Sequence, residues 1–455
     1  MTTAPLPIEE TTELNLIDNI IGLLKAGDDE AIVAQLNQLH ISEIGVLLES
    51  LPPELRHKFW TLLPHGTEGE TLSYLGEEVR GRIFDEMENT EVVAAAETME
   101  IEDLADVIDE LPEHISEAVI ESLDEDRRQR LETTLSFTEG TAGRLMSTDV
   151  ISVRLDVTIA VVLRYLRYLK PLPPHTDALM VTDENGIYLG KLSMANIVSE
   201  KPDTLVSDIM QTDADRVLAD ATDHDVSVLF ERRDLISVAV VDDENKLLGR
   251  ITVDNVVDII MAEADRALLA SAGLVEDEDL FSPILPSAKR RAVWLGINLV
   301  TVFFAAWVIG RFELVLDKIV ALAVLMPVAA SMGGIAGSQT LTLTIRGLAL
   351  GQVSNSNLRW LSSKELSVGL LNGAVWSVIV ALLTYVWFQD YGISLILAAA
   401  MILNLTAAAL SGVLIPVILT RMNIDPALSG AVILTTVTDV IGFLSFLGLA
   451  TLFLL

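Results

Sequence analysis

One carboxylate stands near the middle of the apolar stretch that ends the chain, residues 426–455. Asp439 follows Thr435, Thr436 and Thr438 in a stretch long enough to cross a bilayer, since a membrane helix needs roughly 20 residues. An ionised Asp deep in hydrocarbon costs about 2.5 to 3.5 kcal/mol on insertion scales, so such a residue usually faces water, a partner charge or a bound ion. Thr435 lies one turn before Asp439, so the hydroxyl and the carboxylate share a helix face.

Asp425 is a second carboxylate on roughly the same face of this predicted helix. It precedes Asp439 by fourteen residues, which is about four turns at 3.6 residues per turn. Two carboxylates at different depths on one face would suit a path for a cation. The alternative is a structural hydrogen bond, or an ion pair between Asp439 and an intramembrane base. The nearest basic residues all lie at or near predicted helix ends: Arg346, Arg359, Lys364 and Arg421.

The charge of the 455-residue chain is divided unevenly. The region from Lys289 onward holds nine Lys/Arg and six Asp/Glu of totals of 30 and 65, which leaves a net charge of −38 in the first 288 residues. Such an acidic region does not suit nucleic acid or anionic lipid, and it attracts cations. The chain has no cysteine, which excludes disulfides and thiolate metal sites, and its N-terminus lacks a basic and apolar leader. We therefore expect the acidic half to lie in the cytoplasm.

Residues 12–137 are predicted to be helical, because apolar positions recur at spacings of three and four and Pro stands at segment starts. An internal repeat supports this: residues 41–54 resemble residues 101–113, sixty positions later. Repeats of this kind stack into a small solenoid.

From about Thr141 the pattern changes to short β-rich runs that alternate with helices, and this pattern also repeats. Residues 145–153 match residues 209–217, and residues 181–193 match residues 241–252. The Glu-Asn-Gly and Asp-Glu-Asn segments predict hairpin turns. Two copies of about 60 residues with this layout resemble a tandem pair of CBS domains, which is an α+β fold.

The resemblance to CBS domains implies an adenine nucleotide such as ATP as a ligand. The second copy carries Gly249-Arg-Ile-Thr252-Val-Asp254, one residue shorter between Thr and Asp than the pattern of those domains, and the first copy has Ala195 in place of the Asp. One nucleotide site is therefore expected at most, at Thr252 and Asp254. Both residues also stand where a helix N-cap belongs, and capping alone would explain them.

Five apolar segments follow, at about 292–310, 316–338, 366–388, 392–420 and 426–455. We expect them to form an α-helical membrane domain in which Pro327 and the following glycines bend or interrupt the second helix and allow close packing. The distribution of bases places the N-terminal half in the cytoplasm and the C-terminus outside. Seven bases lie on one side (Lys289, Arg290, Arg291, Arg346, Arg359, Lys364, Arg421) and two on the other (Arg311, Lys318).

These parts together resemble the MgtE family of magnesium channels over nearly the whole chain. The likeness rests on residues 101–112, the CBS pair, the run from Pro327 through Gly333-Gly334 to Gln339, Asp425-Pro-Ala and Thr435-Thr-x-Thr-Asp439. It implies a multidomain homodimer in a lipid bilayer, with no nucleic-acid partner. The implied order is a helical-repeat domain at 12–137, CBS domains at 138–203 and 204–258, a connecting plug helix and linker at 259–288, and five membrane helices at 289–455.

The resemblance implies two kinds of magnesium site. Asp439 would hold a magnesium ion in the pore, and Asp425 would form a second ion site near the cytoplasmic mouth. Mg²⁺ prefers octahedral oxygen coordination and sheds water reluctantly, which suits carboxylates that bind it through its waters. In the cytosolic half, magnesium bridging acidic residues would close the pore, and repulsion between bare carboxylates would open it. The matching positions are Glu102, Asp106, Asp258 and Glu263, each of which could equally lie on a solvated helix face.

Two departures from the family pattern bear on this expectation. Ile335 stands where the family often has Asn after the Gly-Gly pair, and Arg266-Ala267 stand where its plug helix often carries acids. A polar role at residue 335 is therefore in doubt, and gating would be weaker or use other contacts. The alternatives are a transporter of cobalt or manganese, or a nonconducting, membrane-anchored nucleotide sensor. An enzyme is not expected, since no catalytic constellation stands out among the motifs.

Overall fold

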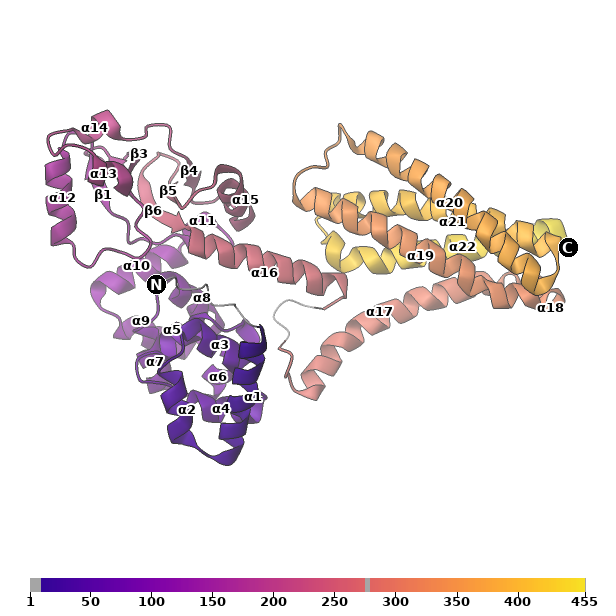
Figure 1. Ribbon diagram of the computed structural model, residues 1–455, viewed down its shortest axis with the longest axis horizontal. Coiled ribbons are helices and arrows are strands. Elements are labelled where there is room, and N and C mark those ends of the chain that lie inside the picture. Colours follow the sequence, from indigo (N-terminus) through magenta and orange to yellow (C-terminus); the bar gives the residue numbers. More distant parts are fainter. Residues whose placement is uncertain (1–9, 275–278, 455) are drawn as a thin grey trace, which may run out of the picture. The chain divides into compact units, whose positions relative to one another are not determined.

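The chain divides into two compact units. One comprises residues up to 264 together with 279–282, and the other comprises 265–278 together with the chain from 283 onward. The computed structural model describes the backbone of residues 10–274 and 279–454, and the side chains of all of these except residues 10–14 and 271 (Figure 1). Part of the predicted linker, residues 275–278, therefore lies outside the described residues.

The first part of the acidic unit is built from short helices, as the periodicity predicts. The repeat appears as two helix pairs, α3–α4 and α8–α9, in which a Leu-Pro step ends one helix and Pro52 or Pro112 occupies the N-cap of the next. The helices pack around one apolar core in which Leu48, Phe59 and Leu104 are fully buried. The elements are α1 (Glu10–Ala26), α2 (Asp29–Leu36), α3 (Ile41–Glu49), α4 (Pro53–Trp60), α5 (Glu68–Ser73), α6 (Glu77–Glu86), α7 (Asn89–Ala96), α8 (Ile101–Glu110), α9 (Glu113–Ser122) and α10 (Glu125–Leu135).

Two copies of one α+β module follow, each with a three-stranded sheet. In both copies the first strand pairs parallel to the second, and the second pairs antiparallel to the third through the predicted hairpin. The two hairpins also bond to each other, since Tyr188 N donates to Asn245 O at 2.9 Å and Leu247 N donates to Gly186 O at 3.0 Å. The elements are α11 (Ala142–Leu145), β1 (Ser152–Arg154), α12 (Ile159–Tyr168), β2 (Ala178–Thr182), β3 (Tyr188–Ser193), α13 (Met194–Ser199), α14 (Val206–Ile209), β4 (Arg216–Leu218), α15 (Asp223–Arg233), β5 (Ser237–Val241) and β6 (Leu247–Thr252).

Helix α16 (Val253–Ser271) starts directly after β6 (Figure 1). It therefore begins inside the range predicted for the second CBS domain. Its first twelve residues belong to the acidic unit, and its last seven to the membrane unit.

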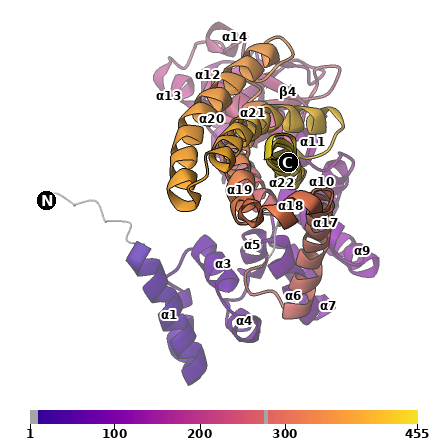
Figure 2. The ribbon, with the colours of Figure 1, turned by 90° about the vertical axis from the view of Figure 1, so that its right-hand side faces the viewer.

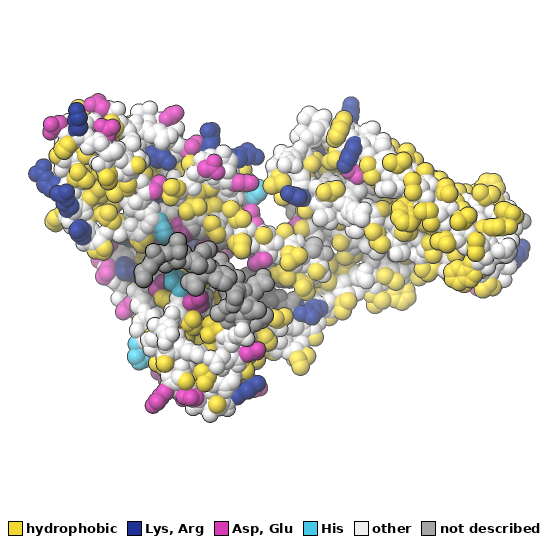
Figure 3. Space-filling view, in the orientation of Figure 1, with side chains coloured by type: hydrophobic (Ala, Val, Ile, Leu, Met, Phe, Trp, Pro, Cys, Tyr) yellow, Lys and Arg dark blue, Asp and Glu magenta, His cyan; other side chains and the backbone are white. Residues whose placement is uncertain are grey.

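Among its described residues, the membrane unit contains five helices that are long and apolar enough to cross a bilayer. Apolar side chains cover the visible face of this unit in Figure 3, as expected for a surface that contacts lipid. The second spanning helix ends later than predicted and the third begins earlier, so that Arg346 and Lys364 lie within helices. Pro327 lies inside an uninterrupted helix. The elements are α17 (Ile284–Gly310), α18 (Glu313–Lys318), α19 (Val320–Ala349), α20 (Leu358–Phe388), α21 (Tyr391–Arg421) and α22 (Pro426–Leu454).

Helix α21 is central in this unit, because it packs against α19, α20 and α22, as the second view shows (Figure 2). Asn404 on α21 is fully buried and donates from Nδ2 to the Ala329 carbonyl of α19 at 2.7 Å. Gly333 on α19 and Gly442 on α22 both lie against this side chain: a Cβ would stand 2.2 Å from Asn404 Nδ2 at Gly333 and 2.9 Å from it at Gly442. The predicted glycine packing thus holds three helices around one buried amide.

This packing gives a matched pair of substitutions. Gly333→Ala should destabilise the purified protein by about 1 to 3 kcal/mol, because the new methyl group overpacks against Asn404. Gly334→Ala should not, because a Cβ there meets nothing within 4 Å. Melting temperatures of the two variants in detergent would test the difference, and equal values would contradict the packing.

Candidate functional site

Helix α8 positions the first predicted sensor residue. Its apolar face, which includes Leu104 and Ile108, is buried in the helical core, and its other face carries Glu102, Asp103 and Asp106. Partial burial raises the pKa of Glu102 to about 7, although hydrogen bonds from its own backbone and from Ser147 oppose the shift.

Further acids near Glu102 influence one another's pKa values. They lie on α8, directly before α8 and on α16. Partial burial raises the pKa of Asp258, and the negative charges of Asp103 and Asp254 raise it further. The pKa of Glu100 is also raised, by burial first and then by Asp103 and Asp254. The Tyr74 hydroxyl has a raised pKa for the same reasons, with Asp258 and Asp103 among the charges that act on it. Like charges from two segments of the acidic unit therefore face one another.

We call this set the acidic site: Glu100, Glu102, Asp103, Asp254 and Asp258. Sequence reasoning named Glu102 and Asp258 as sensors and Asp254 as a nucleotide ligand, but missed Glu100 and Asp103. A sequence signal existed, because Glu100 and Asp103 are spaced i, i+3 and Asp254 and Asp258 are spaced i, i+4, so that each pair shares a helix face.

Asp106 has an ion-pair partner. Arg144 Nε lies 3.2 Å from Asp106 Oδ1, and the same guanidinium also contacts Asp109 and donates to the Ala105 carbonyl. Arg144 is 4% exposed, so these contacts fix α11 against α8. Burial raises the pKa of Asp106, and Arg144 opposes that shift.

Glu263 lies near a different partner. Its Oε1 is 3.1 Å from His224 Nδ1 on α15. Glu263 lies five positions after Asp258, which places the two side chains on different faces of α16. The structure therefore brings Asp258, but not Glu263, to the acidic site.

No group of three His, Asp or Glu side chains that could hold a metal ion by direct ligation occurs among the described residues. The acids of the acidic site interact electrostatically, and water reaches all of them. Glu102 and Asp103 are partly exposed, and Glu100, Asp254 and Asp258 are exposed. Mg²⁺ usually keeps several of its waters in protein sites. The arrangement can therefore attract a hydrated divalent cation.

The predicted nucleotide residues lie at the junction of β6 and α16. Thr252 is buried, and its hydroxyl donates to Asn255 Oδ1 at 3.0 Å, so it binds inside the first turn of α16. Asp254 is exposed, and its carboxylate lies 3.8 Å from His175 Nε2. A nucleotide site at these residues remains a prediction.

In the membrane unit, α22 carries the predicted ion-path residues. Asp425 is exposed just before the helix, and its Oδ1 accepts a hydrogen bond from Ala427 N at 2.8 Å. Asp439 is partly buried, and no hydrogen bond or ion pair joins it to another described residue of this chain. Thr435, one turn earlier, is exposed, whereas Thr438 and Gly442 are buried in the bundle. The Thr435–Asp439 face thus does not belong to the packed core of the single chain.

Sequence reasoning missed a buried carboxylate, Glu365. It is 4% exposed on α20, and it accepts hydrogen bonds from Thr340 of α19 at 3.2 Å and from its neighbour Lys364. The predicted helix began at residue 366, which placed both charges outside the membrane segment. Unlike Asp439, this carboxylate is fully engaged by partners.

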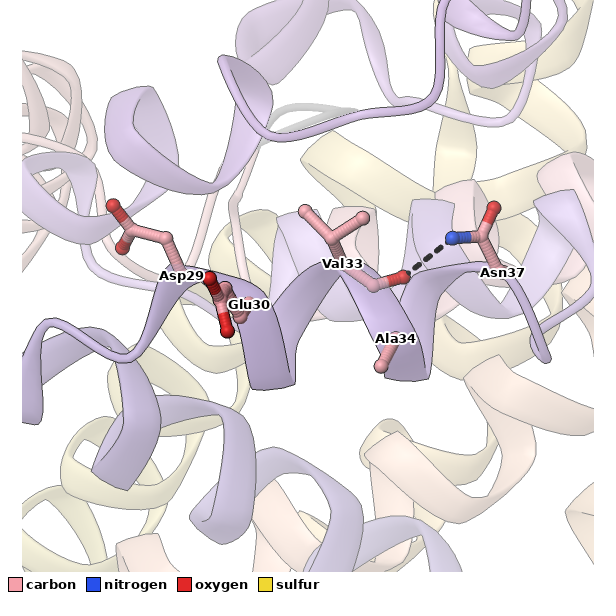
Figure 4. A pocket seen from close by; sticks show the side chains of 5 residues that line it. All are labelled: Asp29, Glu30, Val33, Ala34 and Asn37. Carbon is pink, nitrogen blue, oxygen red and sulfur yellow. Dashed lines mark hydrogen bonds between the residues drawn. The ribbon is translucent and has the colours of Figure 1, made fainter.

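Two hollows of about 410 Å³ each occur outside the acidic site. One is a shallow depression on α2 lined by Asp29, Glu30, Val33, Ala34 and Asn37, where Asn37 Nδ2 donates to Val33 O (Figure 4). Lys58 pairs with Asp29 at 2.9 Å, so this depression is a solvated helix surface. The other lies in the membrane unit, and its α22 wall is formed by Leu428, Ala431, Val432 and Thr435.

The fold and the family matches define a class: a multi-pass membrane transporter of cations with cytosolic helical and CBS domains. The chain belongs to the MgtE family. Residues 326–449 match the MgtE divalent cation transporter family, residues 39–140 match the MgtE intracellular N domain, and residues 142–203 and 206–262 match the CBS domain.

Two relatives are similar over almost their full lengths. The magnesium transporter MgtE of Thermus thermophilus is 31% identical over 439 residues, covering 95% of this chain and 97% of its own. That of Bacillus subtilis is 26% identical over 447 residues, covering 98% and 99%. A crystal structure of the cytosolic domain of the Mg²⁺ channel MgtE in complex with ATP aligns with 53% of this chain and 99% of its own, at 29% identity and a TM-score of 0.49.

The raised pKa of Glu102 predicts a pH-dependent stability. Because the folded chain binds this proton more tightly than the unfolded chain, the contribution is complete below pH 4.5 and is lost as the pH rises through about 7. The free energy of unfolding should fall across this window by at most about 3 kcal/mol, since part of the side chain meets water. Glu102→Gln should flatten this fall in melting temperature between pH 5.5 and 8.0. Glu117→Gln, which removes a charge from an exposed position, should not.

Proposed function

We propose that the chain conducts magnesium through the cytoplasmic membrane along the Asp439 face of α22. The observation that carries the proposal is a carboxylate in a spanning helix that no hydrogen bond or ion pair joins to another described residue. The alignments with relatives named as magnesium transporters extend over 98% and 95% of this chain. Glu365 shows what a paired carboxylate in the same unit looks like, because it is buried and hydrogen-bonded. Asp439 instead keeps its charge available for a passing ion.

The ion path requires a second wall, which we propose is supplied by a second copy of the chain. The exposed face through Thr435 and Asp439 would then line the axis of a homodimer, with two Asp439 carboxylates around one hydrated ion. Asp425 would attract ions at the cytoplasmic mouth. The distribution of bases supports this orientation, with the C-terminus outside.

We further propose that the acidic site senses cytosolic magnesium. Raised pKa values mean that the charged forms of Glu102, Asp103 and Asp258 are disfavoured in this arrangement. A divalent cation relieves that cost, and so favours the state in which α8 and α16 stay together. In this state the pore is closed, and loss of the ion leaves repulsion that opens it. Asp106 and Glu263 act through Arg144 and His224, and a nucleotide such as ATP at Thr252 and Asp254 would add to the charge balance.

The pore assignment predicts that Asp439→Asn abolishes magnesium uptake. The amide keeps the shape of the side chain but loses the charge that offsets ion dehydration. The measurement is flux into liposomes that hold the purified protein, with the melting temperature as a check on folding. Asp425→Asn should reduce the flux only in part. Normal magnesium flux through a folded Asp439→Asn protein would remove the assignment. Cobalt or manganese flux above that of magnesium would change the substrate.

The sensor assignment predicts a shift in the response to magnesium on the cytosolic face. Wild-type flux should fall as this magnesium rises from micromolar to tens of millimolar. Asp258→Asn should move the half-inhibiting concentration upward, roughly tenfold for about 1.4 kcal/mol of lost ion binding. Glu117→Gln on exposed α9 serves as the matched control. Flux that ignores magnesium in the wild type would reject the sensor but keep the pore. A wild type that passes no ion would favour a membrane-anchored sensor.

A further inference from the structure

Residues 279–282, which precede Pro283, the N-cap of α17, group with the acidic unit. Asp279 is the centre of this contact. Its Oδ2 lies 2.9 Å from Arg56 Nη1 and its Oδ1 lies 3.4 Å from Arg56 Nη2. Both side chains are only 3% exposed. Arg56 and Asp279, which lie 223 positions apart in the sequence, thus form a buried bidentate ion pair.

The helical domain holds Arg56 in place independently of Asp279. Arg56 Nε donates to the Leu48 carbonyl at 2.8 Å, and Nη2 also reaches the Glu49 carbonyl at 3.4 Å. These carbonyls lie at the C-terminal end of α3, and Arg56 lies on α4. The guanidinium is therefore pre-positioned by the packing of two helices.

Helix α6 supplies the second half of the contact. Glu78 Oε2 accepts a hydrogen bond from the backbone N–H of Asp279 at 3.0 Å, and Glu78 Oε1 accepts one from the Ser282 hydroxyl. Arg82 Nη2 donates to Ser282 Oγ at 2.8 Å. Inside the segment, Phe281 N donates to Asp279 Oδ1 at 2.9 Å, which folds the backbone around the carboxylate. Leu280 is 89% exposed, so polar groups carry the binding.

This set of contacts has the features of a built binding site. A buried guanidinium without a partner is strongly destabilising, because its charge is left uncompensated. Arg56 therefore favours the state in which Asp279 is bound. An acidic segment is the complement that Arg56 and Arg82 need in a chain region whose net charge is −38.

We propose that Arg56, Glu78 and Arg82 form an intramolecular binding site for residues 279–282, and that this site links the helical domain to the first membrane helix. Pro283 follows the bound segment and is the N-cap of α17, so no linker lies between the segment and the helix. Displacement of the helical domain pulls directly on α17, in addition to any action through α16. The coupling rests on the proposed magnesium gating, whereas the binding site does not.

The binding site is tested by hydrogen exchange on the full-length protein in detergent. Asp279→Asn and Arg56→Met should each speed exchange of the residue 279 and Phe281 amides by tenfold or more. Loss of the ion pair with Arg56 releases the segment, so the residue 279 amide leaves Glu78 and the side chain at 279 no longer holds the Phe281 amide in place. The double variant should be no faster than the faster single variant. Arg154→Met, which removes an exposed ion pair with Asp156 and Glu184, is the control and should leave these amides unchanged. Asp279→Asn lies outside the helical domain, so it keeps the test valid if Arg56→Met misfolds. Unchanged exchange in Asp279→Asn would overturn the site.

The coupling is tested by liposome flux with magnesium varied on the cytosolic face. Asp279→Asn should keep wild-type flux at low magnesium. At high magnesium, the flux that remains should be at least three times that of the wild type. Faster exchange with wild-type inhibition would overturn the coupling and leave the binding site. A wild-type protein whose flux ignores magnesium would reject the proposed gating and the coupling with it, while the exchange result would still decide the binding site.

Discussion

Crowding of like charges between α8 and α16 is the constraint on which the cytosolic half depends. Burial raises the pKa values of Glu100 and Asp258, and the negative charges of Asp103 and Asp254 raise both further. Two like charges about 4 Å apart repel by about 1 kcal/mol in bulk water, and by more beside protein. The fold can accept this arrangement by binding protons, through a base such as His175 beside Asp254, or by attracting cations. The acidic surface therefore destabilises the packing of α8 near α16 and makes that packing sensitive to protons and cations.

Ion pairing distinguishes the carboxylates that hold segments together from those that a cation could bind. Arg144 compensates Asp106 and Asp109, Arg56 compensates Asp279, and Glu365 is engaged by Lys364 and Thr340. Each of these interactions joins two segments, and at least one of its two partners is nearly fully buried. Among the described residues, Asp439 has no ion-pair partner, and the base that pairs with the acidic site is the exposed His175, 3.8 Å from Asp254. In a membrane protein of a cation-transporter family, the carboxylates left without a base are those whose charge an ion can use.

Local patterns predicted the elements well, and long-range partners poorly. The hairpins, the α3–α8 repeat and the five spanning helices follow from periodicity and turn residues, which act over a few positions. The partners of Asp106 and Asp279 could not be predicted this way, because they lie 38 and 223 positions away and no local pattern records them. Glu365 was missed for a different reason. The membrane segment was predicted from apolarity alone, so the charged residues Lys364 and Glu365 were placed outside it, although they pair with each other near the start of the helix. Glu100 and Asp103 were within reach, because their spacing already placed them on one face.

The accessibility of the acidic site to water determines which ions can act on it. Monovalent salt screens over a Debye length of about 8 Å at physiological ionic strength, and it screens partly buried charges less than exposed ones. A divalent cation that keeps its waters can instead sit between carboxylates from both helices and form hydrogen bonds through its hydration shell. It neutralises two charges at one point, and no dry ligand cage is needed. A site of partly hydrated acids can therefore respond to magnesium while ordinary changes in salt affect it far less, which is the property that a cytosolic control of magnesium entry requires.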